Sequence, residues 1–207
     1  EEVNKFAEQL GWPVISEDPL SLNKCISHAA LFLASTVIAK ELTPKTAIVI
    51  GRTTLSRSIN NFIASADKNI VIDSRIATVD TDRNADKRFT QIPTVESNAG
   101  DSEWLEKWQK FSERTSKELE KITQWSEPVL ARTVAAHIKN GTTLFVSSSR
   151  PVRDIEAFAN ARTGIETFAN RGLAGIDGNI STAIGIATSR TSTIAVLGDL
   201  SFLHDLT

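Results

Sequence analysis

Three short runs of polar, charged and glycine residues stand out in the last third of this 207-residue sequence. They are residues 147–153, 170–178 and 198–201, and they follow apolar stretches at 143–146, 165–169 and 193–197. The first two runs lead directly into helical patterns. Strand–loop–helix units in series build a parallel sheet, and ligands bind beyond the carboxyl ends of its strands. We therefore expect the three runs to share one rim that holds anions and a hard metal ion.

The first run places serine hydroxyls, backbone amides and two arginines at the start of a helix. Pro151 is typical of a first helical turn, and a helix N-terminus attracts anions. Arg150 and Arg153 are unfavourable there by about 0.3–1 kcal/mol each. Either the nearby acids Asp154 and Glu156 offset this cost, or the arginines face a ligand carboxylate. The sequence leaves both explanations open.

The second and third runs supply glycines, an arginine and a carboxylate. Gly172, Gly175 and Gly178 let the backbone approach a ligand or adopt a positive φ. Arg171 stands at the end of its strand, where its side chain reaches the rim. Asp199 offers the kind of oxygen ligand that Mg²⁺ takes together with diphosphate oxygens. Each signal is weak alone, and the combination is much more specific.

Composition narrows the class of protein. Hydrophobic residues make up 41% and charged residues 23%, as in ordinary globular proteins. A net charge of -2 gives no overall electrostatic attraction to nucleic acid. No apolar run approaches the roughly 20 residues of a membrane span. Cys25 is the single cysteine, which excludes an internal disulfide and favours a reducing, cytoplasmic compartment. The sequence has no Met, so we expect a fragment of a longer polypeptide.

The upstream pattern predicts an α/β domain over residues 1–125, with a parallel sheet flanked by helices. Continuous β-branched stretches at 46–50 and 69–72 are typical of buried parallel strands, with a helix over 55–64 between them. Gly51 stands alone after the first of these strands. The glycine fingerprint of a dinucleotide site is therefore absent.

The rest of that domain is predicted from periodicity and turn residues. Apolar spacing predicts long helices over 23–42 and 101–124, with His28 inside the first as a structural residue. The tryptophans of the second helix are expected in the core. Short strands are predicted at 14–15 and 90–92, and a solvated loop over 78–90.

A second α/β domain is predicted to begin at residue 126, and residues 126–207 are expected to be its truncated first part. Ser126 can cap a helix with Pro128 in its first turn, and Asn140 and Gly141 stop that helix. Asn179 or Ser181 can cap the helix that follows the glycine run.

Taken together, the three runs resemble the thiamine-diphosphate-dependent enzymes, and within them the menaquinone-pathway branch. The runs Ser-x-x-x-Arg, Asn-Arg-Gly-x-x-Gly-Ile-Asp-Gly and Gly-Asp-Leu-Ser occur in that branch in this order. Leu200 stands where the general Gly-Asp-Gly signature has its second glycine, as in this branch. The resemblance is strong over residues 127–207 and looser over 11–124, which would be the family's central domain.

The resemblance implies transferases of three α/β domains, assembled as homodimers or homotetramers. Thiamine diphosphate would lie between domains of two subunits, and its Mg²⁺ would bind Asp199. Substrate carboxylates would be bound by Ser149, Arg153 and Arg171. The implied cofactor contacts are Gly175, Ile176, Gly198, Asp199, Leu200 and Ser201, with Ile176 supporting the bent cofactor.

The reaction implied by the resemblance decarboxylates 2-oxoglutarate and adds the resulting carbanion to isochorismate. Both substrates are dianions, so arginines at a rim suit such a site. The family's activating glutamate lies in an amino-terminal domain missing here, so no catalytic residue falls within the chain. The 207-residue chain alone is expected to be inactive.

Three alternatives stay open at this stage. The parent protein resembles, less closely, acetolactate synthases and 2-oxo acid decarboxylases, from which Leu200 and the paired arginines distinguish it. The chain also fits a non-catalytic module that binds an anion. Finally, Arg52 and Arg75 follow successive predicted strands, and Arg57 lies one turn beyond Arg52. These three arginines form either a second, regulatory anion site or scattered surface charge.

Overall fold

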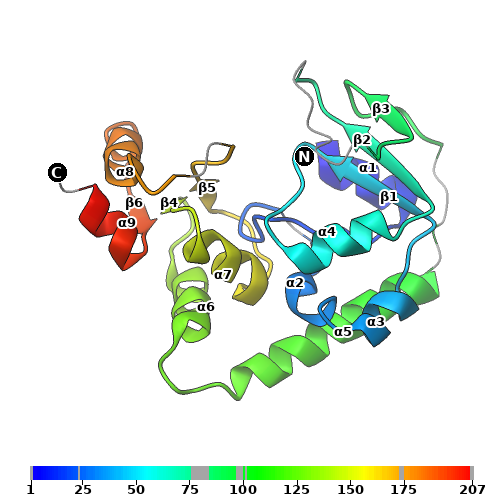
Figure 1. Cartoon of the computed structure of the whole chain (residues 1–207), viewed down its shortest axis with the longest axis horizontal. Helices are drawn as coiled ribbons and strands as arrows, with labels where there is room; N and C mark the ends of the chain where they lie inside the picture. Colours follow the sequence, from blue (N-terminus) through cyan, green and yellow to red (C-terminus); the bar gives the residue numbers. More distant parts are fainter. Residues whose placement is uncertain are drawn as a thin grey trace. The chain divides into compact units, whose positions relative to one another are not determined.

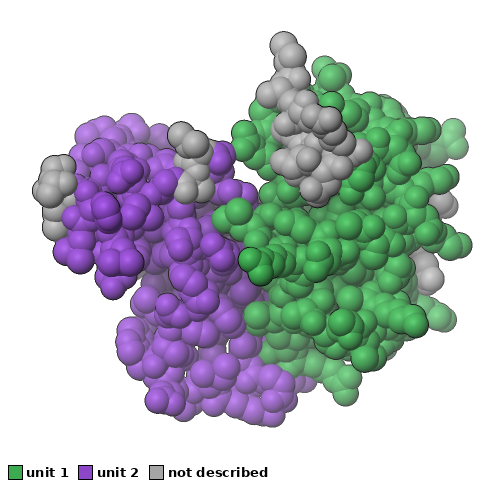
Figure 2. Space-filling model, in the orientation of Figure 1, with its two compact units in different colours: residues 1–15, 29–115 green, residues 16–28, 116–207 purple. Residues whose placement is uncertain are grey.

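The computed structural model describes residues 2–22, 24–75, 84–96, 100, 102–172 and 175–205. The chain forms two compact units, coloured separately in Figure 2. Unit 1 comprises residues 1–15 and 29–115, and unit 2 comprises residues 16–28 and 116–207. The predicted domain boundary after residue 125 stays a prediction. Among the described residues, no helix combines the length and the apolar character that crossing a membrane requires.

Unit 1 contains a three-stranded parallel sheet in the order β1-β2-β3 (Figure 1). Its strands are β1 Thr46–Ile50, β2 Lys68–Ile72 and β3 Lys87–Phe89. Its helices are α1 Glu2–Leu10, α2 Ala29–Phe32, α3 Thr36–Glu41, α4 Arg57–Ala64 and most of α5 Ser102–Glu120. The predicted α/β class is confirmed, and so are the two β-branched strands with a helix between them.

Local sequence accounts for the first strand–helix–strand unit. The β-branched residues of β1 and β2 pair in register, with Ile48 opposite Ile70. Ser56 caps α4, because its hydroxyl accepts a hydrogen bond from the amide of Ile59 at 3.4 Å. The buried residues of α4 are Ile59 and Phe62, one turn apart on one face of the helix. This spacing anchors the helix to the core of unit 1.

Aromatic side chains fill much of that core. Trp108 of α5 is 1% exposed, and its ring meets the rings of Phe32 and Phe62 edge to face at centroid distances of 5.7 and 5.3 Å. Trp104 lies 5.8 Å from Trp108. The prediction that tryptophans on this helix belong to the core is confirmed for Trp108.

The predicted helix over residues 23–42 is wrong. Two short helices, α2 and α3, replace it, and Lys24 and His28 both have a φ of 63°. A left-handed residue interrupts an α-helix. Partners far along the chain hold His28 in this conformation: its Nδ1 donates to the carbonyl of Ala157 at 2.9 Å, and its Nε2 lies 2.8 Å from Oδ1 of Asn160. Apolar spacing over the segment reflects burial rather than one continuous helix.

Two smaller predictions in unit 1 are also wrong. Residues 14–15 form no strand, and the last strand of the sheet is β3 rather than residues 90–92. This strand interrupts the predicted loop over 78–90, of which residues 78–83 lie outside the described residues. All three residues of β3 are exposed, so an edge strand of this kind has no apolar signal in the sequence.

Unit 2 contains a second three-stranded parallel sheet, in the order β5-β4-β6 (Figure 1). Its strands are β4 Thr143–Val146, β5 Glu166–Phe168 and β6 Thr193–Val196. Its helices are α6 Glu127–His137, α7 Arg150–Phe158, α8 Asn179–Ala187 and α9 Asp199–His204. All four residues of the central strand β4 are buried, as its apolar sequence predicts.

Candidate functional site

The three runs follow the carboxyl ends of three parallel, neighbouring strands. Because β4 pairs with both β5 and β6 in parallel, the loops after these strands leave the same edge of the sheet. Two hydrogen bonds tie the first run to its neighbours. The amide of Ser147 donates to the carbonyl of Val196 at 2.9 Å, and the hydroxyl of Ser148 donates to the carbonyl of Asn170 at 3.2 Å. The first run is therefore tied to the second run and to the last residue of β6.

A buried asparagine joins the second and third runs. Asn179 is 0% exposed, and its Nδ2 donates to the carbonyl of Ile176 at 2.7 Å and to the hydroxyl of Ser201 at 2.9 Å. Its Oδ1 accepts from Nδ2 of Asn170 at 3.4 Å. A fully satisfied buried network of this kind fixes the loops that it connects. Asn179 thus sets the positions of the Ile176 backbone and of Ser201.

The predicted cap of α8 is wrong. Gly178, with a φ of 74°, is the N-cap residue, and neither Asn179 nor Ser181 caps the helix. The carboxylate of Asp205 takes that role, because it accepts from the amide of Gly178 at 2.7 Å and from the amide of Ile180. Asn179 is needed in the buried network, so the cap comes from a residue more than twenty positions away.

Ser149 has an unusual backbone conformation at this edge. Its φ is 75° and its ψ is -121°, a region that residues other than glycine rarely occupy. Strain of this kind concentrates at functional sites, where the surrounding structure maintains it. The conformation agrees with the predicted role of Ser149 in contacting a ligand, which stays a prediction.

Replacing Ser149 by glycine is expected to raise the free energy of unfolding by about 1 kcal/mol, because glycine adopts a positive φ without steric cost. Alanine at the same position removes the hydroxyl and keeps the strain, so Ser149→Ala is the matched control. Urea unfolding followed by circular dichroism measures both variants. Equal stability of the glycine and alanine variants would show that the backbone at Ser149 is not strained.

The two arginines of the first run have different environments. Arg150 lies 2.5 Å from Oε2 of Glu127 and 3.6 Å from Oδ1 of Asp154, so acids offset its charge at the helix start. Burial raises the pKa of Asp154, and Arg150 partly opposes this effect. Arg153 is exposed and forms no hydrogen bond or ion pair with the residues that the structure describes. The acid explanation therefore holds for Arg150, and Arg153 remains available at the surface.

Arg171 is paired with an acid that the sequence did not single out. Its Nε donates to Oε2 of Glu17 at 3.0 Å, and its Nη2 lies 2.9 Å from Oε1 without the alignment of a hydrogen bond. The Arg171 side chain is 23% exposed. The only signal for Glu17 in the sequence is an acidic loop at residues 16–18, far from the glycine run along the chain.

The third run presents one carboxylate. Asp199 begins α9 and is exposed, Leu200 beside it is 65% exposed, and the Ser201 side chain is buried in the Asn179 network. Among the described residues, no group of three or more His, Cys, Asp or Glu side chains lies close enough together to hold a metal ion. Asp199 alone could therefore supply one ligand, with the remaining ligands coming from a bound molecule, water or other chain segments.

The glycines of the second run differ in conformation. Gly172 has a φ of 109° and Gly178 a φ of 74°, so both positions favour a residue without a Cβ. Within the described part of the chain, a Cβ added at Gly175 would meet its nearest neighbour, the amide of Asp177, at an ordinary 3.9 Å, and one added at Gly198 would meet no atom within 4 Å. Both positions therefore leave space for a group that approaches the backbone.

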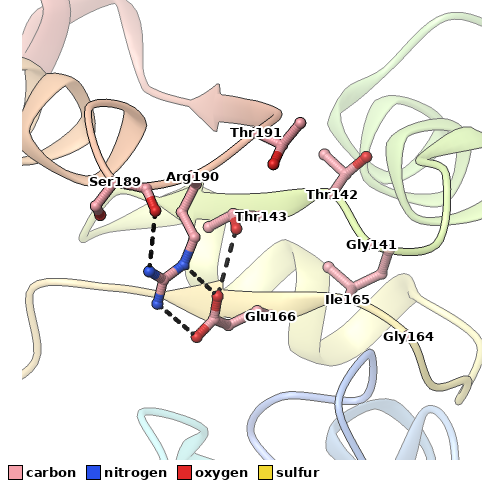
Figure 3. A pocket seen from close by; sticks show the side chains of 9 residues that line it. All are labelled: Gly141, Thr142, Thr143, Gly164, Ile165, Glu166, Ser189, Arg190 and Thr191. Atoms are coloured by element: carbon pink, nitrogen blue, oxygen red, sulfur yellow. Dashed lines mark hydrogen bonds and ion pairs between the residues drawn. The ribbon is translucent and has the colours of Figure 1, made fainter.

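A polar groove of about 430 Å³ lies at the opposite end of the same sheet (Figure 3). It is lined by residues that precede or begin β4, β5 and β6, namely Gly141, Thr142, Thr143, Gly164, Ile165, Glu166, Ser189, Arg190 and Thr191. Arg190 donates to both carboxylate oxygens of Glu166, at 2.6 and 2.9 Å. This pair lowers the pKa of Glu166. The groove holds none of the predicted site residues.

Of the three unit 1 arginines that the sequence suggested as an anion site, Arg75 has an acidic partner next to it. Arg75 donates from Nε to both oxygens of Asp73, at 2.9 and 3.1 Å, and this hydrogen bonding lowers the pKa of Asp73 to about 2. Arg75 is thus already neutralised by an acid next to it. The hypothesis of a second anion site at Arg52, Arg57 and Arg75 stays a prediction.

Comparison with known proteins gives a family and a set of relatives. The family model described as "Middle domain of thiamine pyrophosphate" matches residues 1–146. The chain is 31% identical over 208 residues to the 2-succinyl-5-enolpyruvyl-6-hydroxy-3-cyclohexene-1-carboxylate synthase of Saccharopolyspora erythraea. It is 29% identical over 211 residues to the synthase of that name from Thermobifida fusca, and 33% identical over 227 residues to that from Lactococcus lactis subsp. cremoris.

These similarities extend over nearly the whole chain but only part of each relative. They include 97%, 97% and 100% of this chain, and 37%, 38% and 40% of the three relatives. The chain therefore spans about two fifths of the length of the curated relatives that it matches. The resemblance drawn from the three sequence runs is confirmed.

Proposed function

Because this chain belongs to the family described as "Middle domain of thiamine pyrophosphate", we propose that it is part of a thiamine-diphosphate-dependent synthase of the menaquinone pathway. The proposed reaction decarboxylates 2-oxoglutarate and joins the product to isochorismate. The relatives named above carry the name of this synthase. The observation that carries the proposal is the shared carboxyl edge of β5-β4-β6. There the run containing Arg171 is linked by hydrogen bonds to the runs containing Ser149 and Asp199.

The donor groups at this edge fit the proposed cofactor and its metal. Asp199 presents an exposed carboxylate, and Mg²⁺ is commonly bound by one or two carboxylates together with phosphate oxygens and water. Gly175 and Gly198 have room beside the backbone for a bound group. Ile176, Leu200 and Ser201 complete the proposed cofactor contacts. Thiamine diphosphate, when bound, supplies the carbanion-stabilising chemistry that protein side chains lack.

The chain's own residues would bind and orient the substrates. Both proposed substrates carry two carboxylates, and arginine binds a carboxylate through two parallel hydrogen bonds. Arg171 and Arg153 would supply these contacts, and the hydroxyl of Ser149 would add a neutral donor. Fixed donors at the position of developing charge need no reorganisation during the reaction. Assembly into a homodimer or homotetramer and a cytoplasmic location stay predictions.

The environment of Cys25 is compatible with a reaction that uses no cysteine. Burial raises the pKa of the Cys25 thiol to about 11, so the thiol stays protonated near neutral pH. A protonated, buried thiol is a poor nucleophile. The only cysteine of the sequence is therefore structural, and the proposed reaction does not need it.

An assay of the full-length protein containing this chain tests the proposed function. We expect turnover with 2-oxoglutarate and isochorismate in the presence of thiamine diphosphate and Mg²⁺, and little or none with pyruvate. The 207-residue chain, assayed in parallel, should be inactive. Turnover of pyruvate without turnover of the proposed pair would instead assign the protein to the acetolactate synthase or 2-oxo acid decarboxylase type.

A further inference from the structure

The contact between Glu17 and Arg171 joins residues that are 154 positions apart in the sequence. Both side chains are mostly buried, with 23% of Arg171 and 26% of Glu17 exposed. The carboxylate faces the Nε and Nη2 side of the guanidinium, at 3.0 and 2.9 Å. Partial burial shields this pair from water, so it restrains Arg171 more than a surface ion pair would.

Glu17 sits in a segment that is itself held in place. The hydroxyl of Ser16 donates to the carbonyl of Asp18 at 2.8 Å and accepts from its amide at 3.2 Å, which forms a tight turn around Glu17. The amide of Leu20 donates to Oδ1 of Asp18 at 3.1 Å, and Leu20 is fully buried. The backbone at Glu17 therefore cannot move far without breaking this turn.

Residues after this turn also bind the rest of unit 2 through hydrogen bonds. The carbonyl of Pro19 accepts from the amide of Arg162 at 2.9 Å, and the hydroxyl of Ser27 accepts from the amide of Ala161 at 2.8 Å. His28 donates to the carbonyl of Ala157. These bonds make residues 16–28 part of the unit that carries the rim, although they lie at the other end of the sequence.

We propose that Glu17 is a positioning residue for an anionic ligand: it holds the guanidinium of Arg171 at the rim so that Arg171 can bind a ligand carboxylate. This inference rests on the proposed function for the identity of the ligand, a dicarboxylate such as 2-oxoglutarate. A guanidinium that is already ordered loses less conformational entropy on binding. Glu17 also repels a second carboxylate, so the proposal requires the ordering effect to outweigh that repulsion, and the binding measurement below decides between the two.

The test compares two neutral, isosteric variants of the full-length protein. Glu17→Gln removes the charge that holds Arg171. Glu166→Gln is the matched control, because it breaks a similar glutamate–arginine pair, with Arg190, at the opposite end of the sheet. Calorimetry measures the dissociation constant of 2-oxoglutarate, and turnover at saturating substrate gives kcat. Thermal unfolding confirms that both variants are folded at the assay temperature.

We expect Glu17→Gln to weaken 2-oxoglutarate binding about tenfold, with kcat changed less than about twofold. The control should bind 2-oxoglutarate like the wild type. Unchanged or tighter binding by Glu17→Gln would overturn the inference, because it would mean that the carboxylate is a bystander or a competitor of the ligand.

A second measurement separates this inference from the proposed function. The side-chain Nε–H signal of Arg171 is followed by ¹⁵N NMR without any ligand, and the Arg171→Lys spectrum assigns it. We expect Glu17→Gln to shift this signal and to speed its exchange with water. If the wild type does not bind 2-oxoglutarate, the proposed function is wrong, and an unchanged Arg171 signal in Glu17→Gln separately refutes the positioning role.

Discussion

Replacing Trp108 by alanine is expected to lower the free energy of unfolding by about 3–5 kcal/mol, the cost typical of removing a fully buried aromatic side chain. Trp108 is 1% exposed and contacts the rings of Phe32, Phe62 and Trp104. Its loss leaves a cavity among three rings that pack edge to face, so both transfer free energy and ring contacts are lost. Guanidinium unfolding followed by circular dichroism measures the change.

The control for this prediction is another tryptophan. Trp125 is 72% exposed, so Trp125→Ala should change stability by no more than about 0.5 kcal/mol. A second variant, Trp108→Phe, should be much less damaging than alanine. The indole Nε1 of Trp108 is buried without a hydrogen-bond partner among the residues that the structure describes, so phenylalanine loses no hydrogen bond to them there. Similar losses for alanine at positions 108 and 125 would contradict the packing described for unit 1.

Asp199→Asn in the full-length protein is expected to lower the proposed synthase activity by on the order of 100-fold or more, because the proposed Mg²⁺ site would lose an anionic ligand. Asparagine keeps the size and the carbonyl oxygen of the side chain and removes its charge. The run around Asp199 is otherwise held by Ser201, whose hydroxyl is bound by Asn179, so the loop should keep its shape. The loss should therefore appear as weaker metal binding rather than as unfolding.

Titration of activity with Mg²⁺, and of Mn²⁺ binding by electron paramagnetic resonance, measures the effect. Asp177→Asn is the matched control, because Asp177 lies in the neighbouring glycine run and its side chain is 85% exposed. The Asp177→Asn variant should need the same Mg²⁺ concentration for activity as the wild type. Should Asp199→Asn bind Mn²⁺ as tightly as Asp177→Asn, Asp199 would not be the metal ligand.

Sequence patterns predicted the strands that matter most for the site. β1 and β4 are apolar after a first threonine, β2 ends in an apolar stretch at residues 70–72, and β5 and β6 end just before polar runs begin. Local composition therefore marks both the strands and their carboxyl ends. Parallel pairing then follows from the intervening helices. The predicted gathering of the three runs at one sheet edge needed no information beyond these patterns.

Helix prediction failed where distant partners decide the backbone. Residues 23–42 have apolar spacing that suits a helix, but His28 is held in a left-handed conformation by Ala157 and Asn160. The cap of α8 likewise comes from Asp205 rather than from a residue beside the helix start. Local propensity is a weak guide when tertiary hydrogen bonds are available to offset it.

By itself, the sequence determined the α/β class, the order of the strands along the chain and the positions of Ser149, Arg171 and Asp199 after strand ends, because these depend on residue type and short-range spacing. Only the tertiary structure decided which acid accompanies each arginine, Glu127 with Arg150 and Glu17 with Arg171. It also decided that Asn179 ties two loops together. Such pairings join residues far apart in the chain, and the physical reason they escape a sequence is that no periodicity connects the partners before the chain has folded.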